Sequence, residues 1–153
     1  MEDVNVFEGD VLYTATPDGG DIKIENGLVK DCRNFDTAAY LSLFGGNEND
    51  ADGREKDTWW GNLIPGTDRS EWMQSEFGAT VAGYPLTSAN IQKAEAAAGR
   101  DLAWLRTEAD ADEVNVSLSA TSAKSVNLSV EVMQDGKKTS GCAYEFQWTE
   151  AVR

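Results

Sequence analysis

The C-terminal third of the chain alternates apolar and polar residues with a period of two. Apolar residues occupy every second position over 114–120, 126–132 and 144–148. This period places successive side chains on opposite faces of a strand. Asp and Gly within 134–137 tolerate positive φ and predict the turn between the last two strands. We therefore predict a three-stranded antiparallel meander within 111–153, with one apolar face and one polar face.

The segment before the meander changes to a helical period. Apolar residues recur three and four positions apart from Ile91 to Leu105, which places them on one face of a helix. Thr87 or Ser88 is the candidate N-cap, because a hydroxyl there accepts a hydrogen bond from the first N–H groups. We expect this long helix to pack on the apolar face of the meander.

Two shorter helices are predicted upstream. One covers 37–44, follows cap candidates at 34–36 and ends at a pair of glycines. The other runs from Ser70, as its cap, to Phe77, and residues 78–85 are then a connection to the long helix.

The N-terminal part contains short β-prone segments separated by turn residues. Pro-Asp-Gly-Gly occupies 17–20 and Asn-Gly occupies 26–27, and both are sequences that favour tight turns. This pattern predicts a β-ribbon.

The predicted elements form one α+β domain over the 153 residues. The β-ribbon covers 1–33, a helical region with an acidic loop at 47–70 covers 34–110, and the meander covers 111–153. Hydrophobic residues make up 41% of the chain, which is enough for a core and too much for a disordered acidic tail.

The acidic loop contains two adjacent tryptophans, Trp59 and Trp60, and no periodicity. The two indoles have two interpretations, and the sequence leaves both open. They anchor the loop to the core, or they contact a partner, because Trp is enriched at the energetic centres of interfaces.

Charge and composition exclude several classes of function. The formal net charge is −14, which repels phosphate backbones, so we expect no nucleic-acid binding. The chain has no His, which excludes catalytic triads and metal sites that depend on imidazole. No signal peptide or apolar membrane span is evident, so we expect no membrane association. Cys32 and Cys142 can form one disulfide, but free thiols are the favoured interpretation in a reducing cytoplasm.

No motif predicts a catalytic residue, a metal or a cofactor. Glu48, Asp50, Asp52 and Gly53 match the start of a calcium loop, but its last ligand position would be Trp59 instead of a Glu. No pair among the 27 acids stands out by spacing or apolar surroundings. We expect the acidic residues of the loop to be solvated side chains without a bound metal.

The polar face of the predicted meander has little charge for a surface exposed to water. Small neutral polar residues on strands leave an edge that is able to pair with another chain. This face and the tryptophan pair are the predicted partner interface. Its residues are Trp59, Trp60, Asn115, Ser117, Ser119, Asn127 and Ser129.

Five motifs in order resemble the phage Mu-type contractile tail baseplate family. They are Asp-Gly-Gly-Asp at 18–21, Ala-Tyr-Leu-Ser-Leu-Phe at 39–44, Trp-Trp-Gly-Asn at 59–62, Leu-Ala-Trp-Leu at 102–105 and Phe-Gln-Trp at 146–148. The resemblance extends from about residue 10 to residue 149. The family usually has Asp where this chain has Asn62, which concerns the contacts of the loop more than the fold.

The resemblance implies a structural baseplate component and not an enzyme. A protein of this family is the counterpart of the sheath initiator, and its sheet accepts strands from the first sheath subunit. The implied partners are other baseplate wedge proteins, central hub, spike or tube proteins, and the tail sheath subunit. The implied location is the virion tail baseplate, assembled in the host cytoplasm, with several copies arranged symmetrically around the tail axis.

Two other classes of function remain open from the sequence. A small acidic carboxylate-dependent hydrolase or carbohydrate-binding protein predicts a cleft with paired carboxylates beside Trp59 or Trp60. An acidic mimic of DNA predicts a stripe of carboxylates at the spacing of phosphates.

Overall fold

The computed structural model describes residues 10–16, 19–32, 35–46, 64–68, 72 and 74–148. Six short strands come first: β1 (Asp10–Val11), β2 (Tyr13–Thr16), β3 (Gly19–Ile22), β4 (Ile24–Glu25), β5 (Leu28–Val29) and β6 (Asp31–Cys32). Four helices follow: α1 (Asp36–Phe44), α2 (Glu76–Gly83), α3 (Ser88–Asp101) and α4 (Trp104–Thr107). The chain ends in β7 (Glu113–Ala120), β8 (Ser125–Gln134) and β9 (Lys137–Gln147).

The C-terminal strands form the predicted meander. Their order in the sheet is β7-β8-β9, and both pairs are antiparallel. Asp135 and Gly136 take positive φ in the predicted turn between β8 and β9. Alternate residues of the central strand are fully buried, and these are Val126, Leu128, Val130 and Val132. The predicted α+β class and the two-faced meander are therefore confirmed.

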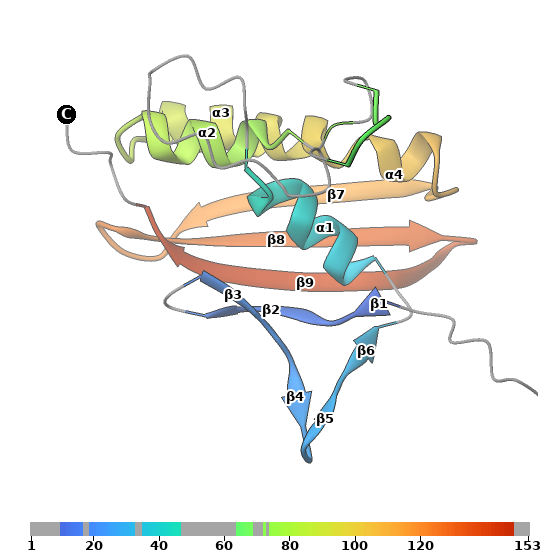
Figure 1. Ribbon diagram of the computed structural model, residues 1–153. Coiled ribbons are helices and arrows are strands. Elements are labelled where there is room, and N and C mark those ends of the chain that lie inside the picture. Colours follow the sequence, from blue (N-terminus) through green and yellow to red (C-terminus); the bar gives the residue numbers. More distant parts are fainter. Residues whose placement is uncertain are drawn as a thin grey trace, which may run out of the picture.

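The helices pack on the apolar face of this sheet (Figure 1). Phe44 of α1 meets Tyr144 and Phe146 of β9 edge to face, with ring centroids 5.6 and 6.0 Å apart. The predicted N-terminal β-ribbon is also present, as the antiparallel pairs β1-β6, β2-β3 and β4-β5. In Figure 1 it lies below β9, and the β4-β5 hairpin forms its far tip.

Helix α1 begins at Asp36, and of the predicted cap candidates at 34–36 the structure describes Phe35 and Asp36. Phe35 is the N-cap residue, and it makes no side-chain cap hydrogen bond. Ser140 of β9 binds this end of the helix: its Oγ accepts from the Phe35 N–H at 2.9 Å and donates to Asp36 Oδ1 at 2.8 Å. The start of α1 is therefore fixed by a strand more than a hundred residues away.

The second short helix was predicted at the wrong place. Of the residues over 70–77 that the structure describes, only Glu76 and Phe77 are helical, and α2 continues through the predicted connection to Gly83. Ser75 is the cap, because its Oγ accepts from the Gly78 N–H at 2.9 Å and donates to the Leu43 carbonyl. Glycines at 78 and 83 lower helix propensity, so the local sequence gave no helix signal there.

The long helix is confirmed at its start and is shorter than predicted at its end. Thr87 caps α3, since its Oγ1 accepts from the Asn90 N–H at 3.2 Å. After Asp101 the backbone tightens, and the Leu105 N–H bonds to the Leu102 carbonyl, three residues back. Leu102 and Leu105 are nevertheless both fully buried, so the predicted apolar face continues through the break into α4.

Asp101 joins the end of α3 to the start of α2 and makes the stability of the fold depend on pH. Its carboxylate accepts hydrogen bonds from the Glu76 and Phe77 N–H groups at 3.0 and 2.8 Å. Burial outweighs these bonds and raises the pKa of Asp101 from 3.8 to about 6. The folded state therefore holds this proton more tightly than the unfolded state, and the resulting stability is lost as pH rises through 6.

We expect the Asp101→Asn variant to lose part of the stabilisation that wild type gains between pH 7 and pH 4. The side chain is partly exposed, so solvent screening reduces the effect to about 1 kcal/mol. Urea unfolding at both pH values measures the difference. Glu108→Gln removes the same charge from an exposed position and is the control. An Asp101→Asn variant with the same pH dependence as wild type would contradict the assignment.

Candidate functional site

The structure brings the five predicted meander residues together on one face of the sheet. Ser117 lies opposite Ser129, and Ser119 lies opposite Asn127. Asn115 precedes this group on β7, opposite Glu131. All five alternate with the core residues, so they occupy the face turned away from the helices. Trp59 and Trp60, the other predicted interface residues, and the calcium-like segment lie outside the described residues.

Small side chains form a row across the middle of this polar face. Ser117, Ser129 and Ala143 are direct neighbours on the three strands. Beside them Lys138 pairs with Glu131 at 2.5 Å across β8 and β9. The Lys138 side chain lies over Gly141, where an added Cβ would come within 2.3 Å of Lys138 Cε. The middle of this face therefore carries only small side chains. The charge of Lys138 at its border is paired with that of Glu131.

One edge of the sheet is covered by α3. The backbone N–H of Leu118 on β7 donates to Glu95 Oε2 at 2.9 Å. A donor on an edge strand is what an added strand would use, and here a side chain of the same molecule already occupies it. The β7 edge is therefore protected at its middle.

On the opposite edge of the sheet, alternate residues of β9 direct their backbone N–H and C=O groups away from β8. The Trp148 N–H donates inward to the Lys124 carbonyl at 2.7 Å. In an antiparallel ladder, the residues that bond inward alternate with residues whose N–H and C=O both point outward. Ala143, Glu145 and Gln147 are the outward residues by this alternation. Their backbone groups form a template for another strand.

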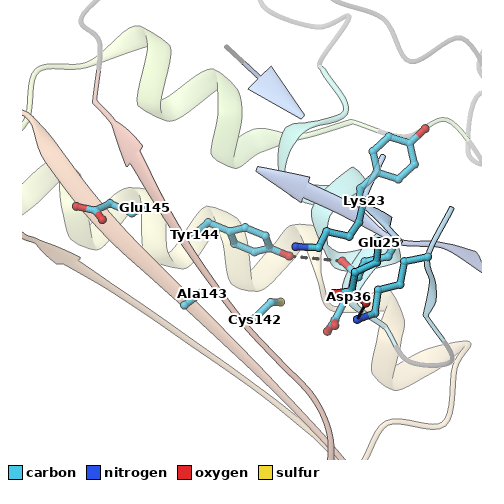
Figure 2. Close-up of a pocket in the computed structure, with 10 residues that line it drawn as sticks. Lys23, Glu25, Asp36, Cys142, Ala143, Tyr144 and Glu145 are labelled. Atoms are coloured by element: carbon cyan, nitrogen blue, oxygen red, sulfur yellow. Dashed lines mark hydrogen bonds and ion pairs between the residues drawn. The ribbon is translucent and has the colours of Figure 1, made fainter. Parts of the chain in front are cut away.

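The β9 edge borders an open cavity of about 540 Å³ (Figure 2). Consecutive residues from Cys142 to Glu145 line it, and since they belong to both faces of the sheet, the cavity follows the edge of the strand. The opposite wall is the β-ribbon, with Lys23, Glu25 and Lys30. The cavity thus places an open strand edge opposite a set of charged side chains.

The charged wall of the cavity carries an ion pair and a second ammonium group. Lys30 Nζ lies 2.8 Å from Glu25 Oε2, and this hydrogen bond lowers the pKa of the exposed Glu25 carboxyl. Lys23 extends toward the Tyr144 ring (Figure 2). It therefore gives the cavity a cation that faces the strand edge.

Two of the side chains that β9 contributes to the cavity, Tyr144 and Cys142, have raised pKa values and stay in their neutral forms. The Tyr144 hydroxyl donates to the Asp36 carbonyl at 3.4 Å, and burial raises the pKa of Tyr144. Burial also raises the pKa of Cys142, which is a free thiol. A thiol that stays protonated is a poor nucleophile. The cavity is therefore suited to binding through backbone hydrogen bonds more than to covalent chemistry.

Within the described ranges, no group of three or more Asp, Glu or Cys side chains is placed to hold a metal ion. None of the helices in that part of the chain has the length and apolar composition needed to cross a membrane. Comparisons with protein-family models, with curated proteins and with solved structures give no match.

Sequence reasoning missed both features that distinguish the two edges. Glu95 lies between Ala94 and Ala96 of α3, and no local signal indicates that its carboxylate reaches a strand. Residues 137–143 of β9 do not alternate regularly between apolar and polar side chains. The sequence therefore did not show that the backbone groups of this edge are open to another strand. Both features depend on which segments the fold brings together.

Proposed function

We propose that this protein is a structural component of a contractile phage tail baseplate. In this role it joins hub and wedge proteins and initiates sheath assembly by strand addition. The ordered motifs that resemble the Mu-type family support the identity of the assembly. The observation that carries the strand-addition role is the open β9 edge, with outward backbone groups at Ala143 and Glu145 beside the cavity.

The strand is proposed to add to β9 and not to β7. Glu95 occupies the Leu118 N–H on the β7 edge, so a strand that added there would first have to displace it. On β9 the incoming segment would lie between the strand and the β-ribbon, where Lys23 is available to a carboxylate. The segment we propose is therefore an extended sheath strand that carries an acidic residue near its centre.

The remaining parts of the proposal follow from this role. The partners are wedge proteins, hub, spike or tube proteins, and the sheath subunit, with several copies around the tail axis in the virion baseplate. Strand addition in each copy would be weak alone and strong when the copies act together, because linked contacts add through effective concentration. No catalytic residue, metal or cofactor is required.

Particles made without this protein test the assignment to a tail. We expect negative-stain microscopy to show tubes or baseplates without an ordered sheath. Normal sheathed tails in the absence of the protein would overturn the proposal.

A proline on the β9 edge tests strand addition separately. Ala143→Pro removes an outward N–H while leaving the inward ladder to β8 in place, since edge strands tolerate proline at such positions. We expect this variant to fold and to fail to restore sheathed tails to particles that lack the protein. Ala143→Ser keeps the N–H and should restore them. If Ala143→Pro also restores them, the β9 edge is not the site of addition, whatever the role of the protein in the tail.

A further inference from the structure

The β4-β5 hairpin ends in an Asn-Gly turn that projects from the rest of the molecule (Figure 1). Asn26 and Gly27 are the two turn residues, and both are exposed and have positive φ, 51° and 77°. Asn26 is also the only Asn of the chain that precedes a Gly. A glycine after Asn leaves its own backbone nitrogen open to attack the Asn side chain, because no Cβ shields it.

The short ladder of this hairpin allows the turn to leave its folded geometry. Strands β4 and β5 have two exposed residues each, and Glu25 and Leu28 form the pair next to the turn. A two-stranded hairpin is marginally stable in water, and such segments open locally at a small fraction of the free energy of global unfolding. The backbone at Asn26 can therefore rotate until the Gly27 nitrogen reaches the side-chain amide carbon.

A second turn of the same kind shows what protects such a site. Asp135 and Gly136 join β8 to β9, and they are also exposed with positive φ, 53° and 68°. This turn closes strands of ten and eleven residues. Asp112 Oδ2 also accepts a hydrogen bond from the Gly136 N–H at 3.4 Å. The corresponding nitrogen of Gly27 has no hydrogen-bond acceptor of this kind among the described residues.

We propose that Asn26 is a site of spontaneous deamidation in the folded protein, made reactive by the short hairpin that carries it. The Gly27 amide nitrogen loses its proton to hydroxide and attacks the side-chain amide carbon of Asn26. The side-chain nitrogen takes up a proton and leaves as ammonia, and a cyclic imide remains. Water then opens the imide at either carbonyl, which gives aspartate or isoaspartate. The net reaction consumes one water molecule, releases one ammonia and needs no enzyme, oxidant or cofactor.

Deamidation changes the wall of the cavity beside β9. Both products add a carboxylate next to Glu25, on a wall whose cations are Lys23 and Lys30. Isoaspartate also lengthens the backbone by one carbon atom, so Glu25 and Leu28 no longer lie opposite each other. Weaker binding of an acidic strand in the cavity is a consequence that rests on the proposed function, whereas the reaction itself does not.

Incubation of the full wild-type chain and of an Asp135→Asn variant at pH 8 over several weeks tests the proposal. The variant has the same Asn-Gly dipeptide in both turns, so the sequence alone predicts equal rates. We expect Asn26 to convert at least about tenfold faster than the new Asn-Gly turn, because the longer ladder opens less often. Trypsin releases each turn in its own peptide, 24–30 and 125–137, in which chromatography and mass spectrometry separate asparagine, aspartate and isoaspartate.

Asn26→Gly is the matched control, because a Gly-Gly turn keeps the hairpin and removes the amide. This variant should unfold like wild type and form no acidic species from peptide 24–30. In guanidinium chloride the two sites of Asp135→Asn should convert at similar rates, because neither turn is folded there.

Two results would overturn the proposal. The first is an unmodified Asn26 in the folded wild type after a period in which the unfolded chain converts. The second is equal conversion at the two turns of folded Asp135→Asn. That outcome would show that the short hairpin does not make Asn26 reactive.

Discussion

Replacing Val130 with Asp is expected to abolish cooperative folding. Val130 is fully buried at the centre of β8, between Val116 on β7 and Cys142 on β9. An isolated carboxylate at this position has no cation to pair with among its strand neighbours, and burying it costs several kcal/mol. That cost is comparable to the whole stability of a typical domain. Circular dichroism and thermal unfolding of the purified variant measure the effect.

Ser129→Asp is the control for this experiment. Ser129 is the preceding residue of the same strand, on the polar face between Ser117 and Ala143. The same carboxylate there reaches water, so we expect a folded protein with a cooperative transition. A soluble Val130→Asp variant with an unchanged melting temperature would show that the face assignment of β8 is wrong.

Replacing Phe77 with Ala is expected to lower the free energy of unfolding by about 3–5 kcal/mol. Phe77 is fully buried, and its ring meets those of Phe44 and Phe146 edge to face at 5.6 and 5.7 Å between centroids. The side chain thus joins α1, α2 and β9, and its loss leaves a cavity between three elements. Urea denaturation, with the midpoint and slope fitted separately, measures the change.

Tyr84→Ala serves as the comparison for Phe77→Ala. Tyr84 follows α2 directly and is 48% exposed, with Lys93 Nζ 5.0 Å from its ring centroid. We expect a loss below about 1 kcal/mol, because an exposed cation-π contact contributes little. Equal losses in the two variants would show that Phe77 does not anchor α2 to the sheet.

Local periodicity was sufficient to predict an element and its faces wherever buried and exposed residues alternate regularly along the sequence. The alternation around Val130 placed the meander strands and their faces, and the spacing from Ile91 to Leu105 placed the apolar side of α3 and α4. The five polar residues from Asn115 to Ser129 could be assigned to one face for the same reason. These predictions succeeded because side-chain direction in a strand or helix is set by position in the sequence.

The errors lie where a distant residue supplies the decisive interaction. Helix α2 begins at Glu76 because Asp101 accepts from its first N–H groups and because Phe77 has a buried site to fill. Helix α1 is found at Asp36–Phe44, as predicted to within one residue, but its contact with Ser140 was not predicted. Local propensity contains no information about partners that lie 25 or 104 positions away.

By itself, the sequence determined the strands and faces of the meander, the apolar side of the long helix and the low charge of the polar face. Only the tertiary structure decided which sheet edge is open and which way the hairpin faces. Glu95 closes β7 through Leu118, and Lys23 and Glu25 turn toward β9 and leave Ile24 in water. The physical reason is that periodicity fixes directions within one element, whereas the availability of an edge depends on what the rest of the chain places beside it.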